Sequence, residues 1–426
     1  MLYASETMMK LFDIRSNSLT MWQKVELCMV MLLAFSVPIA WRLSTILLIL
    51  WIITVVVRAA ADRKLPSGKS CRCWWFLLFA MFYVIHCISM FYTQNLAEGW
   101  ATLEKRLSFL VLPLMFLVFD FSYLDRHNVR KVLYAFVLGI LSVVCCDLLS
   151  AAWDVCFNGA GMWRFFDVNL SSEHHTYISM HICLGIIICF VELVRGKDKP
   201  LWLKIALAVA LLLFTVATVL LSSRAGLLCM VAVYVLLFLW MIFGRKMYRA
   251  GIITAVVAVV GVGVIAVAFP SSVERVTNTI KSLVSSEKTE DVRVTILRST
   301  LPVAKENWLT GVGVGDKIDA YMEQYRKDGN AVSLEREYNS HNQFVDTMVV
   351  TGIVGLALML SFFVVPAVLA VRQRRFNIVF ALFLFMIFFN ALFESVFERQ
   401  AGIMFFVFVF TLLFNAEFVV ERKEEC

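Results

Sequence analysis

The sequence is dominated by apolar runs, each close to the roughly 20 residues that an α-helix needs to cross the hydrocarbon core of a membrane. These runs recur along most of the chain, and short polar segments rich in Arg and Lys separate them. Apolar residues fill 61% of the 426 positions and charged residues only 17%, a balance that no soluble domain of this size could bury. The pattern therefore predicts an all-α polytopic membrane protein, and the lack of sustained alternation argues against a β-barrel.

The apolar runs predict about twelve transmembrane helices. These predicted spans cover residues 25–41, 43–61, 74–92, 103–119, 130–153, 176–194, 201–221, 225–243, 251–269, 344–371, 376–393 and 401–420. The chain then divides into three parts. Residues 1–269 hold the first nine spans, residues 270–343 form one long loop, and residues 344–426 hold the last three spans and a short tail.

Basic residues gather in alternate connecting segments, as the positive-inside rule describes for cytoplasmic segments. This asymmetry predicts a multi-pass protein of a bacterial inner membrane with both termini in the cytoplasm and the long loop on the periplasmic side. The net charge of +7 is explained by these membrane-flanking residues, so we expect membrane lipids and no nucleic acid as partners. Most of the eleven cysteines lie in apolar runs or predicted cytoplasmic loops, so no disulfide framework is expected.

The long loop has a composition typical of ordered protein, because it is neither low in complexity nor depleted of apolar residues. Apolar residues recur in it at helical spacing, which predicts amphipathic helices over the outer mouth of the bundle. The residues in question are Val273, Val276, Ile280, Leu283 and Val284, and then Ile318, Tyr321, Met322 and Tyr325.

The segment YNSHNQFVDTMVVTGIVG, from Tyr338 to Gly355, joins the long loop to the tenth predicted span. Asn339 or Ser340 is expected to cap the helix, which places His341 near its N-terminus, where the helix dipole favours a neutral imidazole. At helical spacing, Gly352 and Gly355 would share a face with His341 and allow close helix contact. Position alone leaves two interpretations open, a catalytic base and an interfacial histidine bonded to a nearby carbonyl.

This segment resembles the O-antigen ligase/polymerase superfamily. His341, Asn342, nine further residues, Gly352, two residues and Gly355 match the family pattern H-[NSQ]-x9-G-x-x-[GTY], and the motif follows the large outer loop as it does in the family. The resemblance covers roughly residues 100 to 400. It implies a GT-C-like fold with a periplasmic helical loop between helices 9 and 10, and it favours a catalytic role for His341.

Arg224 lies in LSSRAGLL, a tight turn between two apolar runs, and a charged side chain there is costly unless it faces a polar cavity. A guanidinium can bind phosphate oxygens in bidentate fashion. Snorkelling to the interface and pairing with a carboxylate are the structural alternatives. With Leu228, Arg224 also fits the R-x3-L pattern of the family.

Three further basic residues are candidates for binding a diphosphate. Lys105 and Arg106 precede the fourth span, and Arg106 with Leu110 repeats the R-x3-L spacing; anchoring at the interface is the alternative for both. Arg293 resembles a loop arginine that occurs in the family upstream of a G-x-G turn, here from Gly311 to Gly315.

A supporting group of polar residues is expected on the same side as the site, with structural roles as the alternative. These residues are Glu173, His174, His175, Glu394 and Arg399. No D-x-D pair and no His, Cys and carboxylate cluster with metal-ligand spacing occurs in the sequence, so we expect no metal and no cofactor. Arginines would then have to meet the charge of a leaving diphosphate.

The resemblance implies an inverting, metal-independent glycosyltransferase that moves a glycan from undecaprenyl diphosphate to lipid A-core at the periplasmic face, a step of lipopolysaccharide assembly. In this scheme His341 is the general base, and Arg224, Arg106 and Arg293 hold the diphosphate. An O-antigen polymerase that joins carrier-linked repeats and a protein O-oligosaccharyltransferase are alternatives within the family. A polysaccharide or lipid carrier is the non-enzymatic alternative, although it would need a binding site near the bilayer midplane.

Overall fold

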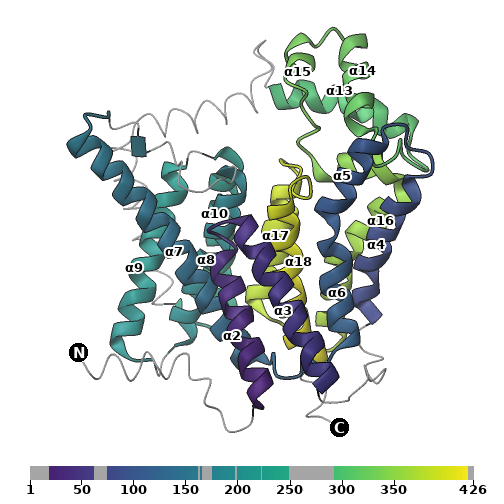
Figure 1. The fold of residues 1–426 in the computed structure, drawn as a ribbon. Helices are drawn as coiled ribbons and strands as arrows, with labels where there is room; N and C mark the ends of the chain where they lie inside the picture. Colours follow the sequence, from purple (N-terminus) through teal and green to yellow (C-terminus); the bar gives the residue numbers. More distant parts are fainter. Residues whose placement is uncertain are drawn as a thin grey trace.

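The computed structural model describes residues 19–61, 74–161, 164–165, 175–196, 199–221, 223–248 and 292–420. Within these ranges the protein is built from helices connected by turns and short loops (Figure 1). The helices that form the bundle are α2 (Met21–Ser36), α3 (Trp41–Ala61), α4 (Leu77–Ser89), α5 (Leu96–Arg106), α6 (Ser108–Val118), α7 (Arg126–Phe157), α8 (His175–Arg195), α9 (Leu201–Leu220), α10 (Arg224–Leu239), α16 (Gln343–Arg372), α17 (Ile378–Ala391) and α18 (Gln400–Phe414). Three more helices, α13 (Val292–Glu306), α14 (Lys317–Lys327) and α15 (Ala331–Glu335), lie at one end of the bundle.

The structure confirms an all-α polytopic membrane protein. Seven of the described helices are long and apolar enough to cross a membrane, and two shorter apolar helices accompany them. The helices agree closely with most of the predicted spans because an apolar run and the polar residues at its ends mark a helix directly. The predicted span at residues 251–269 and the amphipathic helix expected at residues 273–284 lie outside the described residues.

One predicted span differs from the structure. Residues 103–119 belong to two helices, α5 and α6, which meet at Leu107. On α5, Leu103 and Arg106 are buried while Glu104 is exposed, so this helix is amphipathic and runs along the end of the bundle. The apolar run itself begins only with α6.

Two helices form the centre of the bundle. We compare an apolar stretch of 18 residues within each span. In α8, 89% of these residues are buried, and in the span Gln400–Val419, which begins with α18, 94% are buried. In α16 only 22% are buried. Phenylalanine rings fill the space around α18; for example, Phe79 and Phe362 stack with their ring centroids 4.1 Å apart. Since lipid tails are as apolar as these side chains, close packing rather than exclusion from water holds the helices together.

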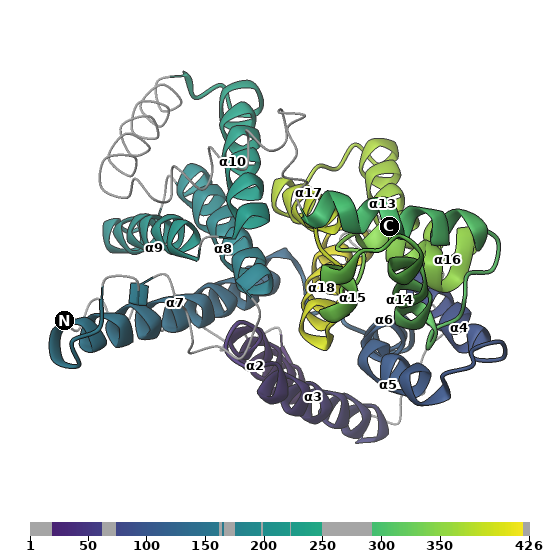
Figure 2. The ribbon, with the colours of Figure 1, turned by 90° about the horizontal axis from the view of Figure 1, so that it is seen from above.

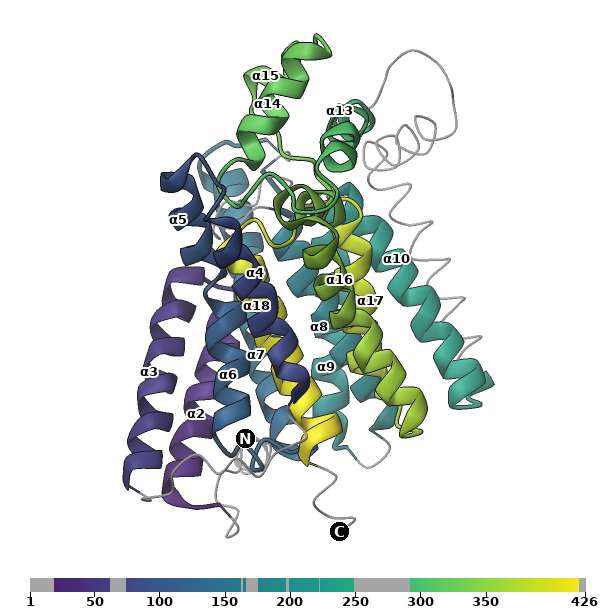
Figure 3. The same ribbon diagram turned by 90° about the vertical axis from the view of Figure 1, so that its right-hand side faces the viewer.

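The helices α13, α14 and α15 form a small layer with its own apolar core over α16, α17 and α18 (Figures 2 and 3). Tyr321 and Tyr325 of α14 are fully buried, and they pack in one cluster with Ile296 of α13 and Val349 of α16. The amphipathic helix expected from Ile318 to Tyr325 is therefore present. We call the end of the bundle that carries these three helices the loop end.

Candidate functional site

His341 lies at the loop end, two residues before α16 begins. Its backbone has a φ of 49°, a left-handed conformation that costs a residue other than glycine about 1–2 kcal/mol. The backbone N–H of His341 donates to Oδ1 of Asn339 at 3.0 Å, which stabilises this conformation. This contact holds the backbone from which the imidazole projects.

The cap of α16 is Asn342, so the expectation that Asn339 or Ser340 would cap this helix is wrong. Asn342 Oδ1 accepts hydrogen bonds from the backbone N–H groups of Phe344 and Val345 at 3.0 and 3.1 Å. The side chains of Asn339 and Ser340 are engaged elsewhere, with the His341 backbone and with Asp346. His341 consequently precedes the cap and is not part of the first helical turn.

Glu394 approaches the imidazole from the turn between α17 and α18. His341 Nδ1 lies 3.3 Å from Glu394 Oε1, and Glu394 is 8% exposed. Because a carboxylate only accepts hydrogen bonds, the proton belongs on Nδ1, which leaves Nε2 with a free lone pair. Glu394 also contacts Thr176 Oγ1 of α8 at 3.4 Å. The arrangement is that of a base oriented by a carboxylate.

A cavity of about 170 Å³ adjoins His341. It brings together segments that are far apart in the sequence: the start of α10, the start of α13, the turn before α16 and the end of α17. Its lining residues are Arg224, Ala225, Leu228, Arg293, Val294, Leu297, Ser340, His341, Asn342, Leu392 and Phe393. The structure thus places four of the predicted site residues, Arg224, Arg293, His341 and Asn342, around one space.

Arg224 is the first residue of α10, which begins at the loop end. Ser223 caps this helix, and its Oγ accepts the backbone N–H of Gly226 at 3.3 Å. A Cβ at Gly226 would lie 2.7 Å from the Ser179 side chain of α8, so the glycine allows α10 to pack closely against that central helix. Two arginines and a histidine then face one cavity with apolar walls, a lining suited to an anionic group attached to an apolar chain.

The other predicted phosphate ligands do not line this cavity. Lys105 extends from α5 towards Glu98, with Nζ 3.5 Å from Oε1 and both side chains more than 40% exposed. Arg106 points into the protein and is 4% exposed, and neither its Nε nor its Nη1 has a hydrogen-bond partner in the part of the chain that the structure describes.

The remaining supporting residues are dispersed. His175 is the first residue of α8, next to the Thr176 that contacts Glu394, and Arg399 is exposed at the start of α18. Glu173 and His174 lie outside the described residues. Of this expected group, Glu394 is the member with a direct contact to His341.

The two motif glycines do not share a helical face with His341 as expected, because α16 is interrupted at Gly352, where φ is 64° and ψ is −160°. The backbone of the loop docks into this break: Ile353 N–H donates to the Trp308 carbonyl at 2.8 Å, and Val312 N–H donates to the Val349 carbonyl at 2.7 Å. Gly352 therefore permits contact with a loop rather than with a helix. Gly355 is helical and packs against the Thr351 side chain.

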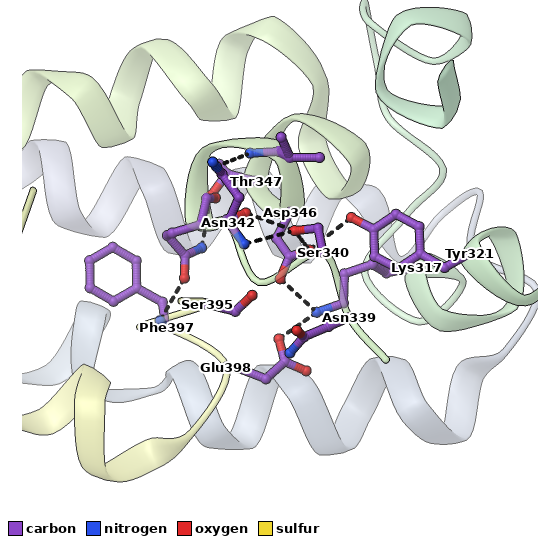
Figure 4. Close-up of polar contacts among 12 residues, drawn as sticks. Lys317, Tyr321, Asn339, Ser340, Asn342, Asp346, Thr347, Ser395, Phe397 and Glu398 are labelled. Atoms are coloured by element: carbon purple, nitrogen blue, oxygen red, sulfur yellow. Dashed lines mark hydrogen bonds and ion pairs between the residues drawn. The ribbon is translucent and has the colours of Figure 1, made fainter. Parts of the chain in front are cut away.

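The sequence analysis did not predict a buried charged cluster that lies beside the site (Figure 4). Lys317 of α14 lies between Asp346 of α16, at 3.4 Å, and Glu398 of the turn before α18. Burial lowers the pKa of Lys317, but the two carboxylates outweigh it and raise the pKa above its usual value. In the sequence, the one sign of this cluster is Asp346, a carboxylate inside an apolar run.

Among the described residues, no group of three or more His, Cys, Asp or Glu side chains could hold a metal ion. Positive charge at the cavity comes from Arg224 and Arg293.

The fold and the site together define a helical integral membrane protein with an arginine- and histidine-lined cavity at one end of its bundle. A family model described as O-antigen ligase matches residues 207–360, so this part of the chain is similar to the O-antigen ligase superfamily. The family implies a glycosyltransferase of the ligase or polymerase type that uses lipid-linked glycans and lipid acceptors. The matched segment includes Arg224, Arg293, His341 and both motif glycines. A comparison with curated proteins found no match.

Proposed function

We propose that the protein is an O-antigen ligase that transfers a glycan from undecaprenyl diphosphate to lipid A-core at the periplasmic face of the inner membrane. The observation that carries this proposal is the cavity in which Arg224 and Arg293 face His341, with Glu394 behind the imidazole. A lipid-linked diphosphate is anionic at its head and apolar along its chain, as the lining of this cavity requires.

His341 acts as the general base in the proposed reaction. The acceptor hydroxyl oxygen attacks the anomeric carbon from the face opposite the diphosphate, and its proton passes to Nε2 of His341. The new C–O bond forms as the bond from the anomeric carbon to the diphosphate oxygen breaks, and the electron pair leaves with the diphosphate. Glu394 keeps the proton on Nδ1 and stabilises the imidazolium that results.

The two arginines of the cavity bind the diphosphate. Each guanidinium group can donate two parallel hydrogen bonds to phosphate oxygens. They stabilise the charge that develops on the leaving group, so the proposed reaction is metal-independent. Because the acceptor attacks from the face opposite the diphosphate, the reaction is inverting. We assign no diphosphate contact to Lys105 or Arg106, because neither lines the cavity.

The position of the cavity supports an enzyme over a carrier. It is lined by residues at the ends of α10 and α17 and at the start of α13, and not by residues from the middle of the spanning helices. A carrier would need its site near the midplane.

The test uses purified protein in detergent, a carrier-linked glycan and lipid A-core, without added metal. We expect wild type to transfer the glycan and His341→Ala to lose transfer while keeping its helical content and its binding of the donor. His127→Ala is the matched control: His127 is exposed at the start of α7 and does not line the cavity, so this variant should transfer normally.

The acceptor and the variants separate the alternatives. Elongation of carrier-linked repeats without transfer to lipid A-core would identify a polymerase, and glycosylation of an added protein acceptor would identify a protein glycosyltransferase. Normal transfer by His341→Ala would refute the catalytic assignment. Donor binding with no transfer to any acceptor would favour a carrier.

A further inference from the structure

Asp346 is a buried carboxylate that the proposed reaction does not use. It lies on α16, five residues after His341, and is 1% exposed. Its Oδ1 accepts hydrogen bonds from Ser340 Oγ at 2.6 Å and from Tyr321 Oη at 2.8 Å, while Oδ2 lies 3.4 Å from Lys317 Nζ. Asp346 is not among the residues that line the cavity, so it does not touch a substrate bound there.

Ser340 connects Asp346 to the site. It is buried, it immediately precedes His341, and it lines the cavity. Its Oγ also accepts the backbone N–H of Asn342 at 3.1 Å, so the residues on both sides of His341 are fixed through one hydroxyl. A histidine with a φ of 49° needs such constraints, because its neighbours must hold the backbone in a sparsely populated conformation.

The groups that hold Asp346 come from the loop helix α14. Lys317 and Tyr321 both belong to it, and Lys317 also pairs with Glu398 in the turn between α17 and α18. The same turn carries Glu394, the partner of His341. One lysine therefore joins α14 both to α16, which begins two residues after His341, and to the turn that carries Glu394 (Figure 4).

A second hydrogen bond holds these two segments together. Gln343, the first residue of α16, accepts the backbone N–H of Phe397 through its Oε1 at 2.6 Å. The start of α16 and the turn before α18 are thus linked to each other directly and to α14 through Lys317. Both sets of contacts involve buried groups, where hydrogen bonds and ion pairs are electrostatically stronger than in water.

We propose that Asp346 is a positioning residue for glycan transfer: held by Lys317 and Tyr321 of the loop helix, it fixes the turn around His341 through Ser340. Docking of α14 onto α16 is then a condition for catalysis, and the loop does more than cover the cavity. This inference rests on the proposed function for the role of His341, but Asp346, Lys317 and Tyr321 are not among the residues that line the cavity.

Two variants test the proposal. Ser340→Ala removes the hydrogen bond to Asp346 and the one from the Asn342 backbone N–H, but it keeps the ion pair of Asp346 with Lys317, so this variant should fold. Asp346→Asn removes the charge, and Lys317 keeps Glu398 as a partner. Asp319→Asn is the matched control, because Asp319 is an exposed residue of α14 that contacts Asn95 on another segment.

The measurements are kcat, the KM for the carrier-linked donor, the thermal midpoint and amide hydrogen exchange in a peptide covering residues 338–342. We expect both variants to lose about 10- to 100-fold in kcat, the size of effect that a misplacement of about 1 Å produces. The donor KM should stay within about twofold of wild type, because the arginines are untouched. Exchange in residues 338–342 should rise, and the control should match wild type in every measurement.

Three results would overturn the proposal. The first is a wild-type kcat in both variants. The second is unchanged exchange in residues 338–342. The third is a loss in which donor KM, kcat and thermal midpoint change together, which indicates general destabilisation. Normal transfer by His341→Ala would instead refute the proposed function, while hydrogen exchange would still decide whether Asp346 fixes the turn.

Discussion

Gly352→Ala tests how the long loop is attached to the bundle. The backbone at Gly352 has a φ of 64° and a ψ of −160°, a region that only glycine occupies readily. A Cβ at this position would lie 2.2 Å from the carbonyl oxygen and 2.4 Å from the carbonyl carbon of Leu309. Both are backbone atoms, so the clash cannot be relieved by a side-chain rotation.

The expected cost follows from the contacts that would be lost. Strain at such a backbone position is of order 1–3 kcal/mol. If the loop moves away to relieve the clash, it also loses hydrogen bonds of about 1 kcal/mol each, among them the bonds from Ile353 N–H to the Trp308 carbonyl at 2.8 Å and from Val312 N–H to the Val349 carbonyl at 2.7 Å. We expect Gly352→Ala to lower the free energy of unfolding by about 3–5 kcal/mol.

Gly329→Ala is the matched control, because Gly329 also has a positive φ, 67°, but a Cβ there would meet no atom within 4 Å. It carries the backbone strain without the clash, so it should lose only about 1–2 kcal/mol. Exchange in residues 308–313 should stay as in wild type. The assay is thermal unfolding of the purified protein in detergent, with amide hydrogen exchange in residues 308–313 as the local measurement.

A clear drop in the thermal midpoint for Gly352→Ala, with faster exchange in residues 308–313, would support loop docking at the helix break. Equal stability of Gly352→Ala and wild type would refute the reasoning. So would a loss in Gly329→Ala as large as that in Gly352→Ala, because backbone strain and not loop docking would then explain the effect.

Three further predictions concern the site. Arg224→Lys keeps the charge but loses the planar fork, so kcat/KM for the donor should fall by about tenfold or more, measured by steady-state transfer; an unchanged value would exclude bidentate phosphate contact. Glu394→Gln should lower kcat by at least about tenfold with little change in donor KM, because the imidazole of His341 loses its charged partner; equal kcat would mean that the contact is not used. Lys105→Ala should keep wild-type transfer and change the free energy of unfolding by less than about 1 kcal/mol, because its pair with Glu98 is exposed; reduced donor binding would restore Lys105 as a phosphate ligand.

The fold class was predictable from the sequence because the thickness of a membrane sets the length of a spanning helix. Predicted spans such as 43–61 and 201–221 agree with α3 and α9 to within two residues. The amphipathic helix around Tyr321 could also be predicted, because helical spacing of apolar residues is a local property of the sequence. The division of residues 103–119 into α5 and α6 could not be predicted, because polar and apolar residues are interspersed where the two helices meet.

The site was predictable only where one segment contains the signal. His341 with its glycines forms a contiguous motif, and Arg224 is conspicuous between two apolar runs. The pairing of His341 with Glu394 joins residues 53 positions apart, and that of Lys317 with Asp346 joins residues 29 positions apart. No periodicity in the sequence relates such partners.

The sequence by itself determined that this chain forms a bundle of apolar helices with a histidine motif where the long loop ends, because helix length and local motifs depend on neighbouring residues. Only the tertiary structure decided which arginines face His341, which carboxylate contacts its imidazole and which backbone segment docks at Gly352. These features depend on how separate helices pack and on where the loop backbone docks into the break in α16. Packing is a property of side chains brought together from distant positions, and it is fixed only when the whole bundle has formed.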